Sequence, residues 1–360
     1  MKALPKVTVL LCVFNGEPYL TSSIHSILNQ TFSDFELLII NDGSTDGTLN
    51  IIQSFNDTRI RLINNNKNQG LISCLNQGIE AAQGVFLARH DSDDLAINDR
   101  LEKQVHYLDS NSKAVLVGTW LSLIDKNGFE LEQWKYPEHP HLVRWAMLFD
   151  SPVGHSSVMF RTEVARELGG YSENHKYAED FEFWSRMSKT GEIVNIPQIL
   201  QQYRIHSESV SSQKNEAQEK MRIMISTANI KEYVHEELGN EVVDFLTNRY
   251  IKTDGTMMLK VISGYQKLLD RFAETNRIND FEKNAIERDI VLRIGNKLQQ
   301  IGIGDRIGTL VKRMDFFSAD FWLTGKFISF IVNEQFKSRI KNFVGKPLQA
   351  TRKTHLANRA

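Results

Sequence analysis

The chain has few cysteines, almost no net charge and no long apolar run. Its two cysteines, Cys12 and Cys74, lack the CxxC spacing of metal or redox sites, so we expect reduced core thiols, as in a cytosolic protein. The formal net charge of −1 excludes the global positive field of a nucleic-acid-binding protein. No stretch approaches the ~20 apolar residues of a membrane-spanning helix. The apolar run Val7–Phe14 is too short and too late for a signal peptide.

Two glycine motifs that bind nucleotides are also missing. Neither a GxxxxGK[ST] phosphate loop nor a GxGxxG turn after the first apolar run occurs, which disfavours hydride transfer with a dinucleotide. The composition is that of an ordinary globular protein, with 41% hydrophobic and 24% charged residues. The length of 360 residues predicts one large domain with an appendage, or two domains.

Apolar runs of strand length alternate with helical patterns in the first part of the chain. The expected strands lie at Val7–Phe14, Glu36–Ile40, Arg59–Ile63, Val85–Ala88, Ala114–Ile124, Ser156–Phe160 and Ile193–Ile196, the last stopped by Pro197. Such alternation predicts an α/β fold with a parallel sheet flanked by helices. Ligands of these sheets gather at the carboxyl ends of the strands.

The character of the chain changes near residue 215, after the polar stretch Ser207–Gln213. We therefore predict an α/β domain over 1–215 and a helical C-terminal region over 216–360. That region ends in a Phe-rich segment, Phe316–Phe336, and in a tail, Lys337–Arg359, with seven basic residues and no acid. Such a tail can seat a protein on anionic lipid, each charge adding about 1 kcal/mol. The alternative is a core helix followed by a frayed tail. Acceptor binding and oligomerisation are two further possible roles of this helical C-terminal region.

A dense carboxylate cluster follows the apolar run Val85–Ala88. Asp91 and Asp93 are two residues apart, so in an extended chain their side chains lean to the same side. A hard divalent ion, Mg²⁺ or Mn²⁺, would relieve their repulsion. Acidic turns are common on protein surfaces, but Asn15 and Asp42 also fall at predicted strand ends. This shared placement predicts a site at one edge of the sheet.

A series of motifs in order resembles family 2 glycosyltransferases. The motifs are Val9–Phe14 with Asn15-Gly16-Glu17, Ile39–Asp46, Asn68-Gln69-Gly70, Arg89–Asp94, Asp99–Gln104, Gly154–Ser157, Ala178–Trp184 and Tyr203–His206. The resemblance implies the GT-A fold, with a Rossmann-like, mainly parallel sheet. It also implies sugar transfer from a nucleotide-sugar, with inversion at the anomeric carbon.

The resemblance implies roles for the matched residues. Asp180 matches the base that removes the proton of the acceptor hydroxyl; by itself it reads as a helix N-terminal acid. Asp91 and Asp93 match the metal pair, with Asp93 the direct ligand, and His206 would complete the shell. The residues expected to contact the donor are Val13, Asn15, Glu17, Asp42, Asn68, Arg89, Asp91, Ser92 and Arg204.

Several of these residues have a second interpretation. Asp42 can be a turn or cap residue, and His206 can be a solvated loop residue. His155 lies in the segment expected to bind the acceptor, but a core histidine fits equally well. For Trp184, near the expected base, a core aromatic is favoured over a sugar platform.

The resemblance also implies the partners. We expect a UDP-sugar donor and a glycan or lipid-linked glycan acceptor in surface polysaccharide biosynthesis, in the cytoplasm or at the inner face of the cell membrane. A single Asp-x-Asp module argues against a bifunctional polymerase. The alternatives are a non-catalytic nucleotide- or glycan-binding protein with the same fold, and a sugar nucleotidyltransferase. The latter needs a glycine-rich basic loop where Asn15-Gly16-Glu17-Pro18 stands.

Overall fold

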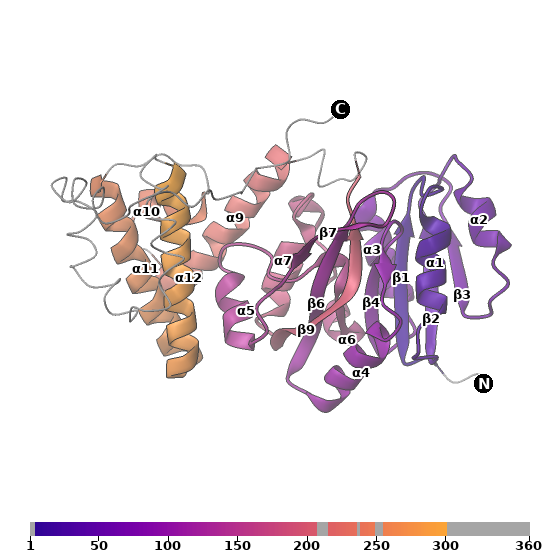
Figure 1. The fold of residues 1–360 in the computed structure, drawn as a ribbon, viewed down its shortest axis with the longest axis horizontal. Coiled ribbons are helices and arrows are strands. Elements are labelled where there is room, and N and C mark those ends of the chain that lie inside the picture. Colours follow the sequence, from indigo (N-terminus) through magenta and orange to yellow (C-terminus); the bar gives the residue numbers. More distant parts are fainter. Residues whose placement is uncertain (1–3, 207–214, 236–237, 249–254, 301–360) are drawn as a thin grey trace. The chain divides into compact units, whose positions relative to one another are not determined.

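The computed structural model describes residues 4–206, 215–235, 238–248 and 255–300 (Figure 1). The chain divides into two compact units, one formed by 1–249 with 267–286 and the other by 250–266 with 287–360. The polar stretch Ser207–Gln213, the Phe-rich segment and the basic tail lie outside the described residues.

Strands and helices alternate from residue 7 to residue 91, as the sequence predicts, and stay mixed up to residue 204. The strands are β1 Val7–Val13, β2 Phe35–Asn41, β3 Ile60–Asn64, β4 Phe86–Asp91, β5 Leu95–Ala96, β6 Ala114–Ile124, β7 Glu130–Trp134, β8 Met159–Arg161 and β9 Glu192–Arg204. The α-helices are α1 Leu20–Leu28, α2 Thr48–Ser54, α3 Leu71–Ala81, α4 Arg100–Ser110, α5 Pro140–Ala146, α6 Thr162–Glu167 and α7 Glu179–Met187. Two short 3₁₀ helices are η1 His155–Ser157 and η2 Glu173–His175.

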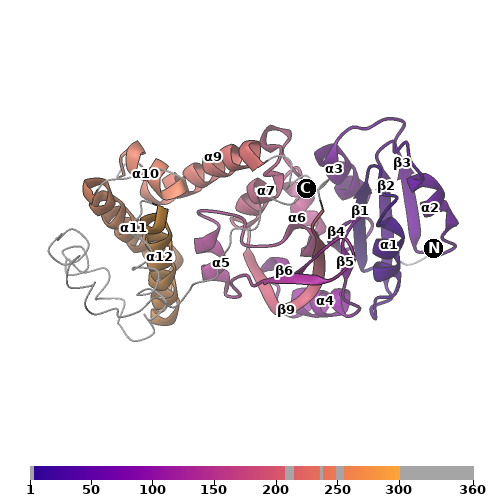
Figure 2. The ribbon, with the colours of Figure 1, turned by 45° about the horizontal axis from the view of Figure 1, so that its top comes forward.

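One nine-stranded sheet organises the first unit. Its order is β3-β2-β1-β4-β8-β6-β9-β5, and β7 pairs with β6 outside this path. Figure 2 shows β3, β2, β1 and β4 side by side, and these strands are parallel. Beyond β4 the sheet is mixed, because β8 is antiparallel to both β4 and β6 while β9 is parallel to β6. The predicted α/β fold is confirmed, with antiparallel strands added in its second half.

Alternation along β1 explains why helices cover both faces of the sheet. Val9 and Leu11 lie in one core cluster with apolar residues of α1 and α4. Leu10, which points to the other face, lies in a second cluster with residues of α3 and α7. Because each face is buried, β1 and β2 are apolar almost throughout, as in other parallel sheets.

Strand β9 continues through Pro197, so the prediction that this proline ends the strand is wrong. Thr119 of β6 pairs with Ile196, and the next residue, Trp120, pairs with Ile199. Pro197 therefore sits in an irregularity of the ladder, where its missing N–H breaks no regular pairing. The strand then extends to Arg204 and carries its last residues to the acidic cluster.

All described elements from residue 215 onward are helices, as predicted: α9 Asn215–Val234, α10 Asn240–Thr247, α11 Gly255–Asn276 and α12 Asp280–Gln300. The two compact units divide at other positions, so the domain boundary near residue 215 stays a prediction. The second unit buries Val261, Tyr265 and Ile290. In the described part of the chain, no helix is both long and apolar enough to cross a membrane.

Candidate functional site

Three neighbouring strands end at one edge of the sheet. Strand β1 lies between β2 and β4, with Val13 opposite Asn41 and Cys12 opposite Asp91. The parallel register therefore brings the segments that begin at Asn15, Asp42 and Ser92 to the same edge, as the sequence predicts.

The first two of these segments are fastened to each other. Asn15, whose φ of 53° is in the left-handed region, donates its N–H to Ser44 Oγ at 2.9 Å and accepts from the Thr45 N–H at 2.9 Å. The Gly47 N–H donates to a Glu17 carboxylate oxygen at 2.8 Å. Asn15 and Glu17, both expected to contact the donor, thus also shape the rim of the site.

Asp42 holds the loop before α3 in place. Its buried carboxylate accepts the backbone N–H of Gln69 at 3.0 Å, that of Gly70 at 2.9 Å and the Asn65 side-chain amide at 3.1 Å. Burial pushes the pKa of Asp42 upward, but these hydrogen bonds, led by that of Gln69, outweigh it and lower the pKa. Asp42 is therefore neither a simple turn residue nor a cap of α2.

Replacing Asp42 with Ala should lower the free energy of unfolding by about 1–3 kcal/mol near neutral pH, because the N–H donors lose their acceptor. A carboxyl whose pKa is lowered by folding stabilises above its unfolded pKa of about 3.9 and ceases to do so as the pH falls through its folded value. The difference between wild type and variant should therefore shrink in acid. Urea unfolding at several pH values measures it. Asn68→Ala, an exposed position in the same loop, is the control, and an equal loss there would contradict this role of Asp42.

The two acids of the cluster differ in their partners. Asp91 forms an ion pair with Arg89, whose side chain is buried, and its carbonyl accepts from Ser23 Oγ at 2.9 Å. Burial raises the pKa of Asp91 despite the Arg89 charge. Asp93 instead lies with one carboxylate oxygen 2.8 Å from His206 Nε2. Asp93 and His206, both expected as metal ligands, thus lie in contact, and their binding of an ion stays a prediction.

Arg204 fixes the acidic loop to the turn that joins β6 and β7. Its Nε donates to the Asp93 carbonyl at 2.8 Å, and Nη1 donates to the carbonyls of Asp125 at 3.1 Å and Lys126 at 3.3 Å. Its backbone N–H donates to Asp94 Oδ1 at 2.8 Å. The buried guanidinium therefore positions the loop by backbone contacts, and its expected contact with the donor stays a prediction.

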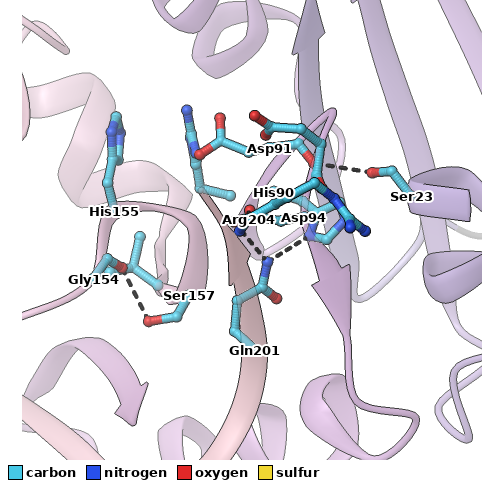
Figure 3. A network of polar contacts seen from close by, with 12 residues as sticks. Ser23, His90, Asp91, Asp94, Gly154, His155, Ser157, Gln201 and Arg204 are labelled. Carbon is cyan, nitrogen blue, oxygen red and sulfur yellow. Dashed lines mark hydrogen bonds and ion pairs between the residues drawn. The ribbon is translucent and has the colours of Figure 1, made fainter. Parts of the chain in front are cut away.

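A buried polar network beneath the cluster is not apparent from the sequence. Arg100 donates to Gln201 Oε1 at 2.7 Å and to the Arg89 carbonyl at 2.7 Å. Gln201 reaches from β9 to His90 Nδ1 at 3.2 Å and to Asp94 at 3.3 Å (Figure 3). Burial lowers the pKa of Arg100 to about 9. Gln201 lies beyond Pro197, where the sequence suggests no strand, so no local signal pointed to this network.

Asp180 lies in the first turn of α7, half-buried, with one oxygen accepting the Phe181 N–H at 2.8 Å. Burial and the neighbouring Glu179 charge raise the pKa of Asp180 to about 7. The Asp150 charge adds to this, and the Arg89 charge opposes it, so Asp180 is within electrostatic reach of the Arg89–Asp91 pair. A carboxylate that titrates near neutral pH is suited to accept a proton.

Trp184 and His155, for which the sequence analysis left open a role in binding the sugar or the acceptor, both pack with other aromatic side chains. Trp184 is fully buried and packs against Phe160, Phe183 and Tyr171, so the core interpretation is confirmed. His155 lies 3.1 Å from the Tyr171 hydroxyl, and burial lowers its pKa. It is thus a hydrogen-bonded, neutral histidine, and its role in acceptor binding stays a prediction.

The cluster fits an ion that is bound jointly with a substrate. Among the described residues, no group of three His, Cys, Asp or Glu side chains could hold a metal by itself. Mg²⁺ and similar ions are usually held by one or two carboxylates together with substrate phosphates. Asp93 with His206 matches that pattern better than Asp91, which is paired with Arg89.

Comparisons with known proteins identify relatives of the chain. The model for glycosyl transferase family 2 matches residues 8–169. An uncharacterized glycosyltransferase of Haemophilus influenzae is 32% identical over 295 residues, which are 78% of this chain and 91% of that protein. The O-antigen biosynthesis glycosyltransferase WbnJ of Escherichia coli is 32% identical over 58% of this chain and 83% of its own length.

The fold also resembles a solved structure. Residues 1–349 of S. aureus TarS, in complex with UDP-GlcNAc, superpose with a TM-score of 0.52 at 18% identity, covering 86% of this chain and 92% of that one. At this identity the likeness concerns the fold alone. With the family model and the relative from Haemophilus influenzae, it leads to one conclusion: the chain belongs to glycosyl transferase family 2 and is a glycosyltransferase with the GT-A fold.

Proposed function

We propose that the chain transfers a sugar from a UDP-sugar, with inversion, to a glycan or lipid-linked glycan acceptor in surface polysaccharide biosynthesis. Two comparisons support the choice of donor and process. WbnJ is named for O-antigen biosynthesis, and the TarS structure contains UDP-GlcNAc.

The observation that carries the proposal is that Asp180, the proposed base, lies within reach of the charge of Arg89 in the acidic cluster. Asp180 has a pKa of about 7 and feels the charge of Arg89, which is paired with Asp91. One site thus holds a carboxylate able to take a proton at neutral pH and acids suited to a diphosphate-bound ion. Both can promote sugar transfer to a hydroxyl, the base by taking the proton and the ion by stabilising the diphosphate.

The proposed reaction is a single displacement. The acceptor hydroxyl oxygen attacks the anomeric carbon on the face opposite the diphosphate, and Asp180 takes the hydroxyl proton as the new C–O bond forms. The bond from the anomeric carbon to the diphosphate oxygen breaks, and the nucleoside diphosphate departs with the electron pair. One displacement at that carbon inverts its configuration.

The other residues bind and orient the donor. Asp93 and His206 would hold a divalent ion, Mn²⁺ or Mg²⁺, which when bound supplies Lewis-acid stabilisation of the diphosphate charge. Arg89 orients Asp91, and Arg204 holds the loop that presents both acids. The proposed nucleotide contacts at the same edge are Val13, Asn15, Glu17, Asp42, Asn68 and Ser92.

UDP together with Mn²⁺ should raise the melting temperature of the protein, because a ligand that binds only the folded state stabilises it. At a concentration of 100 times Kd the gain is about 2.7 kcal/mol. Thermal shift with a panel of nucleotides and nucleotide-sugars measures the effect, with ADP and GDP as controls. Failure of UDP and every UDP-sugar to shift the melting point would contradict the proposed donor. Binding without turnover on any donor would favour the non-catalytic alternative.

A further inference from the structure

The hairpin formed by β6 and β7 presents an exposed aromatic pair. Trp134, at the end of β7, stacks on Tyr203 of β9 with ring centroids 6.1 Å apart and an interplanar angle of 24°. The Trp134 side chain is 40% exposed, and Tyr203 is half-buried. We propose that these two rings form a platform for a pyranose ring of the acceptor glycan. The proposal rests on the proposed transferase function and deepens it.

The strand register explains why the two rings meet. Trp134 lies opposite Leu121 of β6, and Tyr203 lies beside Leu123 on the other side of that strand. Because Leu121 and Leu123 are two residues apart, their side chains share one face of the sheet, and so do Trp134 and Tyr203. Both leucines are buried, whereas Trp134 is exposed beside them on the same face.

The platform adjoins the acidic cluster. Tyr203 directly precedes Arg204, which holds the Asp93–Asp94 loop. Trp134 is two residues before Tyr136, whose carbonyl accepts from Trp120 Nε1 at 3.0 Å. A glycan ring on the platform thus lies next to the acidic loop that Arg204 holds, where the donor is proposed to bind.

The chemistry of the patch suits a sugar. A pyranose has one apolar C–H face that packs on an aromatic ring and a rim of hydroxyls that need polar partners. Glu132, which is exposed, lies in register with Leu123 and Tyr203 on the same face and can accept hydroxyl hydrogen bonds. An aromatic surface with a carboxylate at its rim therefore fits a neutral glycan ring.

The hairpin is held rigid before any ligand arrives. At its turn, Asp125 Oδ1 accepts the N–H groups of Asn127 at 2.8 Å and Phe129 at 2.9 Å. Arg204 binds the carbonyls of Asp125 and Lys126 from the other side. A preorganised surface loses less conformational entropy on binding, which favours a fixed platform over a mobile flap.

The test uses the full chain with UDP and Mn²⁺ on an array of immobilised bacterial glycans. Trp134→Ala should weaken binding of the recognised glycans at least about tenfold, as expected for an aromatic anchor. Trp134→Phe, which keeps a ring, should retain most of it. Phe129→Ala is the matched control, because Phe129 is 71% exposed on the same hairpin and its ring is not part of the stacked pair. It should bind glycans as wild type does.

The outcomes separate this proposal from the proposed function. A thermal shift with UDP and Mn²⁺ in wild type and in Trp134→Ala shows that both are folded and bind the donor nucleotide. With those shifts present, equal glycan binding by the two proteins overturns the platform and leaves the transferase proposal standing. Wild type that binds no glycan on the array overturns the platform as well. Absence of any UDP shift in wild type counts instead against the proposed donor.

Discussion

Replacing Asp180 with Asn should lower kcat for sugar transfer by about 10²–10⁴-fold, which is the usual contribution of a general base. The amide keeps the shape of the side chain and still accepts the Phe181 N–H through its oxygen, but it cannot take a proton. UDP binding should be unchanged, because the predicted nucleotide contacts lie on β1 and β4 and in the loops that follow β1, β2, β3 and β4. Steady-state kinetics and the UDP thermal shift together measure both quantities.

A matched control for this variant is Glu163→Gln. Glu163 is an exposed acid in the first turn of α6, the same helix position as Asp180 in α7. It should leave kcat near the wild-type value. If Asp180→Asn retains full activity, or if the two variants lose activity equally, Asp180 is not the base.

The pH dependence of the wild-type transfer rate is a second test of whether Asp180 is the base. Asp180 acts as a base only when ionised, and its pKa is raised to about 7 by burial and by the Glu179 charge. The rate should therefore fall about tenfold for each pH unit below this value and level off above it. The residual activity of Asp180→Asn should not follow this acid limb. A profile shared by both proteins would assign the limb to another group.

Removing the metal should have the next largest effect. EDTA should reduce the transfer rate of wild type by about 10³-fold, since Lewis-acid stabilisation of the departing diphosphate is worth several kcal/mol. Added Mn²⁺ should restore the wild-type rate. Asp93→Asn should show a similar loss that Mn²⁺ does not restore, because the amide lacks the charge that binds the ion.

The control for the metal experiment is Asp109→Asn. Asp109 lies on α4 and pairs with Lys6 at 2.8 Å, so its loss changes the total charge equally without touching the cluster. It should respond to EDTA and Mn²⁺ as wild type does. Full activity of EDTA-treated wild type, or Mn²⁺-restored activity of Asp93→Asn, would remove the ion from the mechanism.

The sequence alone was sufficient to predict which strand ends form the site. Apolar strands buried on both faces produce near-continuous apolar runs, and their ends are visible wherever a polar residue follows. Because parallel strands share one carboxyl edge, Asn15, Asp42 and Asp91 could be placed together without a structure. The match of ordered motifs then identified the family that the comparisons show.

The tertiary structure decided which of these groups contact one another. Arg89 forms an ion pair with Asp91, and Arg204 donates a hydrogen bond to the Asp93 carbonyl. Gln201 forms hydrogen bonds with both Arg100 and His90. These contacts join residues up to 111 positions apart, across an irregular β9 that continues past Pro197. Strand periodicity records which face of a strand is buried, but not the register between distant strands or the hydrogen bonds across them. For the same reason the stacking of Trp134 on Tyr203 could not be predicted from the sequence. The two residues are brought together only by the pairing of β7 and β9 with β6.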